Sequence, residues 1–354
     1  MSTTLFDPVR LGRMQLANRI AMAPMTRSRA TDDDLPTDLH ATYYSQRATA
    51  GLIVTEGVQP SRNGKGYCRT PGIYNAQQVR AWRAVTDAVH QRGGHIALQI
   101  MHCGRIASRV NQDPAAEIVA PSAIAARGKI FTEQGMKPFD EPRALDTQEI
   151  PGLIEEYRQA TANAYAAGFD AVELHCASGY LPAQFLSTGT NHREDEYGGS
   201  LENRLRFVLE VLAAMNAVDG ADRVGIRICP GNPFNDLSDE DPGETFAALL
   251  QAITPLELAY LHLIRLPAGA IDNLALVRDN YRGKLIVNDG YDFESGQQAV
   301  AEGQADMVSF GRNFISNPDL VERYRRGASL TDMELSTLYT PGPEGYIDYP
   351  ALDT

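Results

Sequence analysis

The sequence contains few cysteines and no apolar run long enough to cross a membrane. Its 354 residues include four cysteines, scattered at positions 68, 103, 176 and 229. Because none of them forms a C-x-x-C pair, we expect neither a zinc site nor a redox dithiol, while disulfide bonds stay open. No segment approaches the roughly 20 apolar residues of a transmembrane helix. The amino-terminal residues also lack the apolar core of a secretory signal, so we expect a cytoplasmic protein without a membrane partner.

Basic residues are outnumbered by acidic ones. The chain has 32 Lys and Arg against 45 Asp and Glu, which gives a formal net charge of -13 at pH 7. Sequence-independent binding of nucleic acid needs a basic surface, so we expect no nucleic-acid partner. The remaining composition, 43% hydrophobic and 22% charged, is typical of a globular protein with a sizeable core. The length fits either two domains or one large barrel.

Short apolar segments alternate with helical patterns along the whole chain. We expect buried strands at residues 20–24, 51–55, 95–100, 171–174, 224–229, 260–264, 285–289 and 307–310. We expect helices at 39–50, 75–90, 148–167, 201–217, 244–252, 271–281, 294–302 and from 317 onward. Such alternation predicts parallel β/α units, and eight units favour an α/β fold of the closed (β/α)8 TIM-barrel type over an open doubly wound sheet. The lack of a G-x-G-x-x-G motif after the first strand also argues against the open sheet.

Two segments add to this regular pattern. Residues 3–17 are expected to form a short hairpin that turns at Gly12, ahead of the first barrel strand. Residues 104–146 form a long excursion after the third strand, without sustained periodicity. Loops of this length in a compact domain are usually functional or contain small structure of their own. We expect residues 1–354 to form a single domain.

Polar side chains follow several of the expected strands directly. His175, Ser178 and Tyr180 come just after the fourth strand, in the stretch FDAVELHCASGYLPAQF. A lone histidine is more often a half-buried residue with a satisfied hydrogen bond than a catalytic one. The carboxyl ends of barrel strands, however, form the open face that carries the active site. Other polar or glycine residues at the expected strand ends are Thr26, Gln99, His102, Gly290, Gly311 and Arg312.

Arg227 lies inside the otherwise apolar fifth strand, VGIRIC. A buried charge is costly unless it is paired, which leaves two interpretations open. Arg227 forms a salt bridge to a neighbouring strand, or it holds an anionic or electron-rich ligand on the barrel axis. Gly290 and the pair Gly311-Arg312 follow the seventh and eighth strands, where barrels commonly bind phosphate through backbone N–H groups.

Longer motifs run along the chain. In order they are LFDPVRLG, NRIAMAPMTRSRA, GLIVTEG, LQIMHCGR, PRALDTQEIPGLIEEY, AGFDAVELHCASGYLPAQFL, REDEYGGSLENRLRF, VGIRI, SFGRNFISNPDL and EGYIDYP. This series, from about residue 4 to residue 351, resembles the Old Yellow Enzyme family, and most of all its bacterial N-ethylmaleimide reductase and pentaerythritol tetranitrate reductase branch. The resemblance implies flavin mononucleotide (FMN) in the barrel and NADPH or NADH as the reductant.

The resemblance also implies roles for individual residues. Thr26 would hydrogen-bond the pyrimidine edge of the flavin, Gln99 would contact the ring, and Arg227 would lie beside flavin N1 and O2. Further cofactor-binding residues would be Pro24, Met25, Gly57, His175, Asp289, Gly290, Gly311 and Arg312, of which the last four would surround the phosphate. The substrate pocket would include Tyr67, Met101, Asn235 and Tyr339.

Some positions depart from the family pattern. Ser178 follows His175 where the family usually has His-x-x-Asn or His-x-x-His, and Met101 stands where tryptophan is common. Strand seven ends in NDG, with Asp289, where NGG is common, and Gly57 takes a place usually held by alanine. These changes bear on substrate activation and pocket shape rather than on the fold.

The function implied by the resemblance is that of an NAD(P)H-dependent FMN oxidoreductase, an ene-reductase. Hydride would pass from the nicotinamide to flavin N5, and from N5 to an activated alkene such as an α,β-unsaturated carbonyl, a maleimide or a nitroalkene. His175 and Ser178 would donate hydrogen bonds to the substrate oxygen, and Tyr180 would supply the proton. The alternatives are a nitro-compound or nitrate-ester reductase or an NADPH oxidase on the same barrel, and a non-flavin barrel that binds a phosphorylated metabolite. We expect no metal, and a monomer or homodimer.

Overall fold

The expected apolar segments form a closed parallel barrel. The structure is a computed structural model and describes residues 2–352. The barrel strands are β3 (Ile20–Met22), β4 (Leu52–Val58), β5 (Ile96–Ile100), β10 (Ala171–Cys176), β11 (Val224–Ile228), β12 (Tyr260–Ile264), β13 (Leu285–Asn288) and β14 (Met307–Phe310). Each strand pairs in parallel with its neighbours, and β14 pairs with β3 to close the ring. The prediction of a (β/α)8 TIM barrel is confirmed.

The strands are mostly apolar, without alternation, because both of their faces are covered. Every residue of β5 and β11 is buried, although β5 contains Gln99 and β11 contains Arg227. Strands buried on both faces read as continuous rather than alternating apolar runs. The polar side chains inside these runs are therefore the exceptions that need partners within the barrel.

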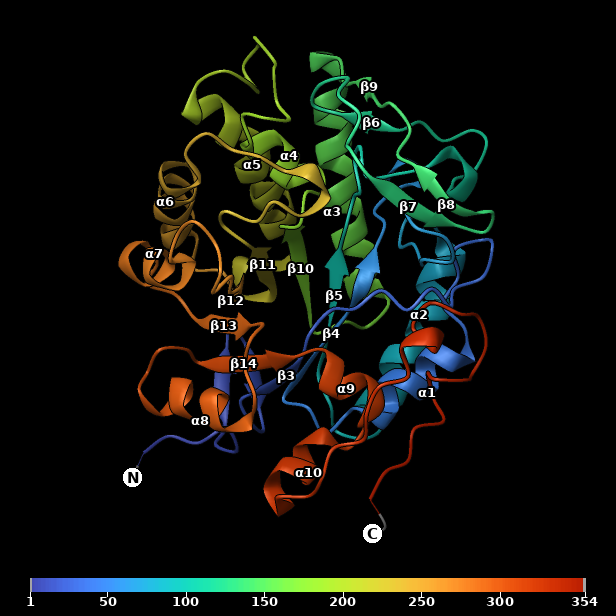
Figure 1. Cartoon of the computed structure of the whole chain (residues 1–354), viewed down its shortest axis with the longest axis vertical. Coiled ribbons are helices and arrows are strands. Elements are labelled where there is room, and N and C mark those ends of the chain that lie inside the picture. Colours follow the sequence, from blue (N-terminus) through green and yellow to red (C-terminus); the bar gives the residue numbers. More distant parts are fainter. Residues whose placement is uncertain (1, 353–354) are drawn as a thin grey trace.

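Helices surround the barrel on its outside (Figure 1). They are α1 (Asp38–Gln46), α2 (Ala76–His90), α3 (Ile150–Ala166), α5 (Leu201–Asp219), α6 (Pro242–Ile253), α7 (Asn273–Asn280), α8 (Phe293–Ala301) and α10 (Leu320–Arg326). Helix α2 begins with a side-chain cap, because the Asn75 side chain accepts hydrogen bonds from the backbone N–H groups of Gln77 and Gln78 at 2.9 Å. Two short helices, α4 (Leu181–Leu186) and α9 (Arg312–Ser316), were not predicted, since so few residues show no helical periodicity.

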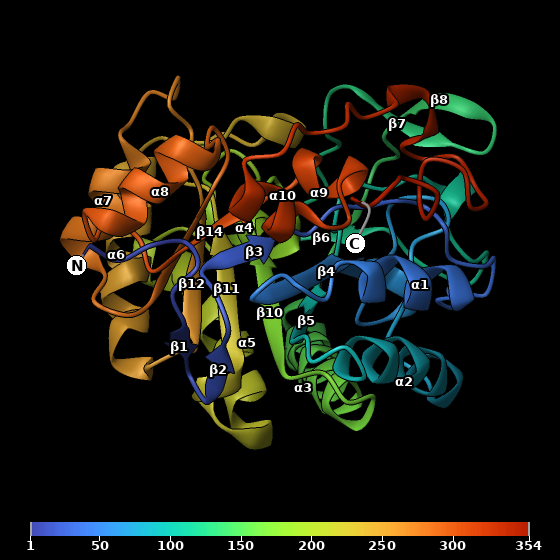
Figure 2. The same cartoon turned by 90° about the horizontal axis from the view of Figure 1, so that it is seen from below.

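The amino-terminal hairpin closes one end of the barrel. Its strands, β1 (Val9–Leu11) and β2 (Met14–Leu16), pair antiparallel, and Gly12 at the turn has φ +54. Leu11 and Leu16 pack in one cluster with Leu52 and other residues from the amino ends of the barrel strands. Figure 2 shows this hairpin at the end of the barrel opposite the β7–β8 hairpin. The predicted hairpin is confirmed, and it leaves the carboxyl ends of the strands as the open face.

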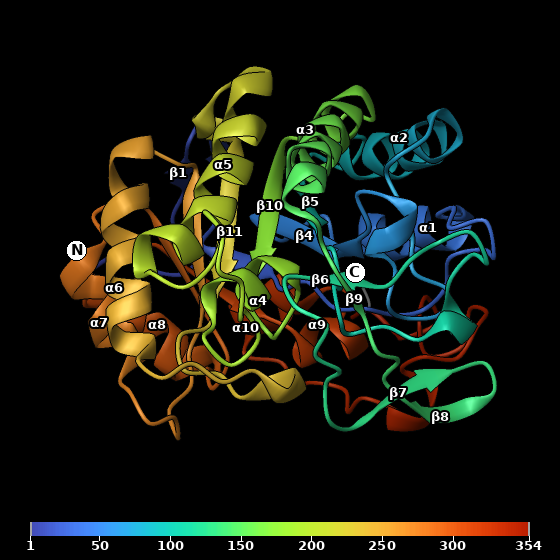
Figure 3. The same ribbon diagram turned by 90° about the horizontal axis from the view of Figure 1, so that it is seen from above.

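The excursion after β5 contains small structure of its own, as expected. It holds the strands β6 (Val119–Ala120), β7 (Lys129–Thr132), β8 (Gly135–Pro138) and β9 (Arg143–Ala144). Strands β7 and β8 form an antiparallel hairpin, and β6 pairs in parallel with β9. Figure 3 shows the β7–β8 hairpin beside the carboxyl-terminal segment, over the open face.

Buried arginines fix the carboxyl-terminal segment to the loop after β3. Arg27 Nη2 donates to the Gly345 carbonyl at 2.7 Å, and Arg29 Nη2 donates to the Thr337 carbonyl at 2.7 Å. Tyr346 stacks on Tyr43 with the ring centroids 4.0 Å apart. Because guanidinium groups present several donors, a few residues hold a segment that has little regular structure. This anchoring places the tail at the open face.

The structure also bears on disulfide bonds, metal sites and membrane-spanning helices. The four cysteines are buried and form no disulfide. Within residues 2–352, no group of three or more His, Cys, Asp and Glu side chains is placed to hold a metal ion. Over the same residues, no helix is both long and apolar enough to span a bilayer.

Candidate active site

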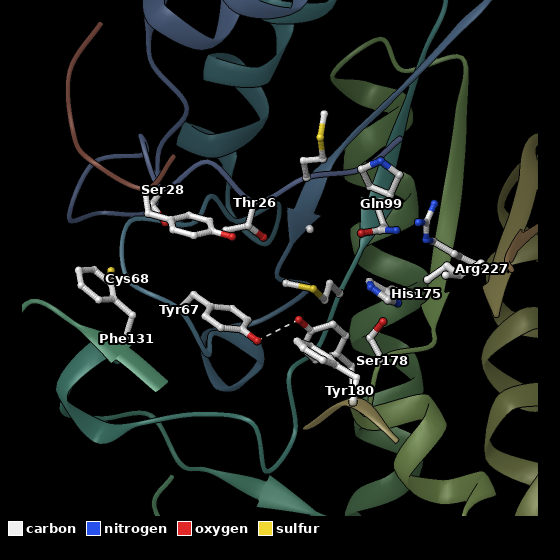
Figure 4. Close-up of a pocket in the computed structure, with 17 residues that line it drawn as sticks. Thr26, Ser28, Tyr67, Cys68, Gln99, Phe131, His175, Ser178, Tyr180 and Arg227 are labelled. Carbon is white, nitrogen blue, oxygen red and sulfur yellow. Dashed lines mark hydrogen bonds between the residues drawn. The ribbon is translucent and has the colours of Figure 1, made fainter. Parts of the chain in front are cut away.

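A cavity of about 350 Å³ opens at the carboxyl ends of the barrel strands (Figure 4). Most of the predicted site residues line it, although they come from segments far apart in the sequence. They are Pro24, Met25, Thr26, Gly57, Tyr67, Gln99, Met101, His175, Ser178, Tyr180, Arg227 and Tyr339. The barrel therefore brings the polar strand ends together, as the parallel arrangement predicts.

A second cavity of about 390 Å³ adjoins the first, since Pro24, Met25 and Arg227 line both. It contains the residues predicted at the ends of β13 and β14, namely Asp289, Gly290, Gly311 and Arg312. Asn235 lies in neither lining. Its Nδ2 donates to the Ser178 carbonyl at 2.8 Å, and its side chain also lies beside the Tyr67 and Tyr180 hydroxyls, so it supports three lining residues.

His175 is held as a neutral donor. The backbone N–H of Ala177 donates to His175 Nδ1 at 3.3 Å, which leaves the ring proton on Nε2. Burial is the main cause that lowers the His175 pKa to about 3, and the nearby Arg227 cation adds to the effect. The imidazole is therefore uncharged at neutral pH, with Nε2–H available to a ligand in the cavity.

Tyr180 is held as a protonated phenol. Its hydroxyl lies 3.0 Å from the Tyr67 hydroxyl, and its ring packs edge-on against His175 with the centroids 4.7 Å apart. Burial raises the pKa of Tyr180 well above 10, and the neighbouring Tyr67 raises it further. Tyr180 thus keeps its proton at neutral pH, which a general acid requires. Figure 4 shows the two hydroxyls facing each other at one side of the cavity.

Ser178 occupies an unusual backbone conformation between β10 and α4. Its φ is +57, in the left-handed region that non-glycine residues seldom adopt. The carbonyl is fixed by Asn235, while the hydroxyl has no hydrogen-bond partner among the described residues. Its side chain therefore lines the cavity with an O–H that is free to rotate toward a ligand.

Arg227 has protein partners that the sequence did not identify. Its Nη1 donates to the ring of His262, 2.7 Å from Nε2, and its Nη2 donates to Asn288 Oδ1 at 2.6 Å. The carboxylate of Glu173 lies on the other side of His262, with Oε2 at 2.8 Å from Nδ1. Neither sequence-based interpretation is sufficient alone, because Arg227 is paired through an intermediary and also lines both cavities.

Gln99 belongs to the same polar group. Its Nε2 donates to Glu173 Oε1 at 2.8 Å. Because an ionised carboxylate can only accept, the amide nitrogen must face Glu173, which leaves the Gln99 carbonyl oxygen for other donors. Glu173 and His262 were missed by the sequence reasoning, although a polar residue in each of the apolar runs AVELHC and YLHLI was a usable signal.

Two departures from the expected pattern contact each other. A Cβ built on Gly57 would lie 2.4 Å from Met101 Cε and 2.5 Å from Met101 Sδ. Real Cβ atoms do not approach so closely, so the missing side chain at position 57 gives the methionine its space. The Gly57–Met101 contact thus forms part of the cavity wall as one unit.

Five further residues line the cavity and were not predicted. Phe131 on β7 and Phe234 after β11 line the mouth with 44% and 57% of their surface exposed. Ser28, Cys68 and Ile264 complete the lining. Exposed loop residues follow no periodic pattern, so the sequence gives no signal for them. His102, by contrast, is fully buried outside the cavity, and its Nδ1 accepts from the Gly104 N–H.

Comparison with known families gives a match over most of the chain. Residues 4–331 match the family described as "NADH:flavin oxidoreductase / NADH oxidase family". Among curated proteins, 12-oxophytodienoate reductase 7 of Oryza sativa subsp. japonica is 42% identical, over 98% of this chain and 94% of its own. A probable flavin mononucleotide-dependent alkene reductase of Leishmania infantum is also 42% identical, over 98% of this chain and 97% of its own.

Solved structures show the same architecture. Morphinone reductase in complex with tetrahydroNAD has a TM-score of 0.95 and 45% sequence identity, over 99% of this chain and 98% of its own. The Old Yellow Enzyme homologue from Zymomonas mobilis has a TM-score of 0.96 and 41% identity, over 99% of this chain and 100% of its own. Because the matches cover nearly the whole of each chain, the similarity includes the loops as well as the barrel.

Proposed function

This chain belongs to the NADH:flavin oxidoreductase / NADH oxidase family, the family of Old Yellow Enzyme, and we propose that it reduces the C=C bond of activated alkenes. It is an NAD(P)H-dependent flavin oxidoreductase with FMN as its cofactor. The proposed substrates are α,β-unsaturated carbonyls, maleimides and nitroalkenes, on one flavin-binding domain of residues 1–354. A relative named as an alkene reductase and several named as 12-oxophytodienoate reductases support this class.

The two adjoining cavities suit the parts of FMN. The first presents hydrogen-bonding side chains at Thr26, Gln99 and Arg227, as a flavin ring with donors and acceptors along its edge requires. The second has glycine at 290 and 311, and a Cβ at Gly311 would lie 3.3 Å from Met25 Sδ. Space that a side chain would fill suits backbone contacts to a phosphate, and Arg312 adds a cation.

In the proposed reaction, His175 and Ser178 polarise the substrate. When bound, FMN would supply to the alkene the reducing equivalents that come from the nicotinamide. His175 Nε2–H and the Ser178 hydroxyl donate hydrogen bonds to the carbonyl or nitro oxygen of the substrate, where negative charge develops. Because His175 is already neutral and fixed by the Ala177 N–H, this donor needs no rearrangement during the reaction.

Tyr180 provides the proton for the α-carbon. The raised pKa keeps the phenol protonated until charge develops on the substrate. Tyr67, whose hydroxyl lies 3.0 Å away, orients the Tyr180 O–H group and can return a proton afterwards. The observation that carries the proposal is this arrangement, in which a neutral histidine donor and a protonated tyrosine line the same cavity as Arg227.

The proposal is tested by separating the two halves of the reaction under anaerobic conditions. We expect NADPH or NADH to bleach the visible flavin absorbance, and cyclohexenone, N-methylmaleimide or nitrostyrene to restore it. The variant Tyr180→Phe should reduce at the wild-type rate with the nicotinamide, but react roughly a hundredfold more slowly with cyclohexenone, within the usual range for loss of a general acid.

The matched control for this variant is Tyr67→Phe, which removes the hydroxyl beside Tyr180 and leaves the proton donor in place. We expect it to slow the reaction with cyclohexenone less than Tyr180→Phe does. Equal slowing of both half-reactions by Tyr180→Phe would show that Tyr180 is not the proton donor. Absence of alkene reduction by a flavin that the nicotinamide reduces normally would refute the proposed substrate class.

A further inference from the structure

A chain of buried polar side chains runs inside the barrel beneath the active-site cavity. Neighbouring strands from β5 through β10 to β14 each contribute one member: Gln99, Glu173, Arg227, His262, Asn288 and Ser309. The hydrogen bonds among their side chains are between 2.6 and 3.0 Å long. Such a continuous network costs desolvation energy, and its members could be apolar if only packing mattered.

The protonation of the network follows from its donors and acceptors. Burial lowers the pKa of His262 to about 4, and Arg227 lowers it further, while the histidine and the arginine keep Glu173 ionised. The ionised Glu173 can only accept, so His262 donates from Nδ1 and its Nε2 carries a lone pair. The Ser309 hydroxyl lies 2.7 Å from Nε2 and can donate to this lone pair, while Arg227 Nη1 lies against the ring, 2.7 Å from Nε2 and 3.0 Å from Nδ1. The order is thus carboxylate, neutral imidazole, guanidinium.

In this order, Arg227 is linked to its counter-ion, Glu173, through His262 and makes no direct contact with it. Among the described residues, no carboxylate forms a salt bridge with the Arg227 guanidinium, and the opposite charge that most affects it is Glu173. His262 and Asn288 together engage both terminal nitrogens of Arg227. The arginine is therefore fixed in place while its charge is only partly offset.

We infer that Glu173 and His262 are positioning residues which, through Arg227, set the reduction potential of the bound flavin. This inference rests on the proposed placement of Arg227 at the N1–O2 edge of the flavin. Reduction adds negative charge at that edge, so the fixed cation favours the reduced form. Glu173 opposes it by partly cancelling the same cation, and His262 determines where the cation lies.

We therefore expect variants of Glu173 and His262 to have different effects, the first on the flavin potential and the second on the affinity for FMN. Glu173→Gln removes the negative charge but keeps an oxygen that accepts from His262. We expect the ratio of reduced to oxidised flavin affinity to rise by about tenfold, which is a potential about 30 mV higher for a two-electron couple. His262→Leu frees the guanidinium, so FMN in either redox state should bind about tenfold more weakly. His262→Gln, with an acceptor for Arg227 and a donor for Glu173, should restore most of that affinity.

The measurements are the flavin potential, taken with a reference dye in substrate-free holoenzyme, and the FMN dissociation constant from fluorescence titration. The matched control is Glu56→Gln. Glu56 is 1% exposed, like Glu173 a buried strand carboxylate, but its neighbours are Tyr44, His40 and the Arg27 backbone rather than Arg227. We expect this control to leave the potential unchanged.

The possible outcomes distinguish the roles of Glu173 and His262 from the proposed placement of Arg227 at the flavin. If Arg227→Lys changes neither the potential nor the FMN affinity, Arg227 does not face the flavin and its proposed placement fails. If Arg227→Lys shifts the potential while Glu173→Gln does not, or Glu56→Gln shifts it equally, the role of Glu173 is overturned. If His262→Gln binds FMN no better than His262→Leu, the positioning role of His262 is overturned. If His262→Leu does not fold, the flavin potential of Glu173→Gln still tests the role of Glu173.

Discussion

Replacing Ser178 by asparagine should strengthen the donor pair that holds the substrate oxygen. The Ser178 hydroxyl is short and rotates freely, because none of the described residues fixes it, whereas His175 is fixed by the Ala177 N–H. An asparagine amide reaches further and presents its N–H group in a plane. The backbone should tolerate the change, since φ is +57 and asparagine adopts left-handed conformations more readily than most residues. The Asn235 contact is to the backbone carbonyl and is retained.

The size of the effect is bounded by the energetics of one hydrogen bond. A complete oxyanion donor contributes about 2.7–4 kcal/mol, but Ser178 already offers an O–H group at the same position. Exchanging a loosely held donor for a better placed one should therefore gain about the net value of one neutral hydrogen bond, roughly 0.5–1.5 kcal/mol. That gain corresponds to roughly 2- to 13-fold tighter binding of an oxygen ligand.

The assay is a titration with p-hydroxybenzaldehyde, whose phenolate oxygen resembles the developing enolate, followed at the long-wavelength charge-transfer band. Ser178→Asn should lower the dissociation constant and raise the rate with cyclohexenone by similar factors, with an unchanged melting temperature. Ser178→Ala, which removes the donor, is the control and should move both values the other way. Tight binding by the wild type, with no gain in the asparagine variant, would show that Ser178 is a spacer for a bulkier substrate.

Three further changes follow from other contacts. Gly57→Ala should lower the free energy of unfolding through overpacking, by up to about 1–3 kcal/mol. Adding Met101→Ala should recover most of this loss, because it removes the two atoms nearest to the new Cβ, Met101 Cε and Sδ, although Met101 Cβ at 3.0 Å remains. Asp289→Asn should tighten FMN binding severalfold in fluorescence titrations, since the Asp289 carboxylate lines the phosphate cavity and accepts the Gly290 N–H that a phosphate would use. Urea unfolding should show lower stability at pH 5 than at pH 7. The fold lowers the pKa of four buried histidines to about 3 or 4, namely His40, His102, His175 and His262, whereas histidine pKa values in the unfolded chain are near 6.5. The unfolded chain therefore binds more protons between about pH 4 and 6.5, and the raised pKa of Glu56, about 7, offsets this effect only in part.

Most of the fold could be read from the sequence because burial determines it. The strands β12 and β14 have the bounds that the apolar runs predict, since a doubly covered strand ends where its apolar residues end. The helices α4 and α9 escaped prediction because they are too short for a hydrophobic stripe, and their backbone is set by contacts such as Gln184 Nε2 to the Cys103 carbonyl. The position of the β7–β8 hairpin depends on long-range contacts that no local pattern records.

The site was predicted at the level of single residues but not of pairs. The polar strand ends were recognisable, and the cavity brings them together. The contact of Gly57 with Met101 and the link from Arg227 to Glu173 join residues that are 44 and 54 positions apart. Such pairs arise from barrel register, which places His175 opposite Arg227 and Glu173 opposite Gln99 on adjoining strands. Register depends on all strands at once and cannot be read from any one of them.

The alternation of a strand explains how one segment can take both of its proposed roles, toward the cofactor and toward the substrate. Glu173 and His175 are separated by one residue of β10, so both side chains point into the barrel while Leu174 packs outward. The first enters the polar network beneath the cavity, and the second, one step nearer the carboxyl end, lines the cavity. A one-residue shift of β10 would bury both on the helix side. The pairing of β10 with β5 and β11 thus fixes both positions. Because Glu173 lies in the network beneath the cavity and Ser178 lines the cavity itself, we expect variants at these two residues to act on the two separate steps proposed for them.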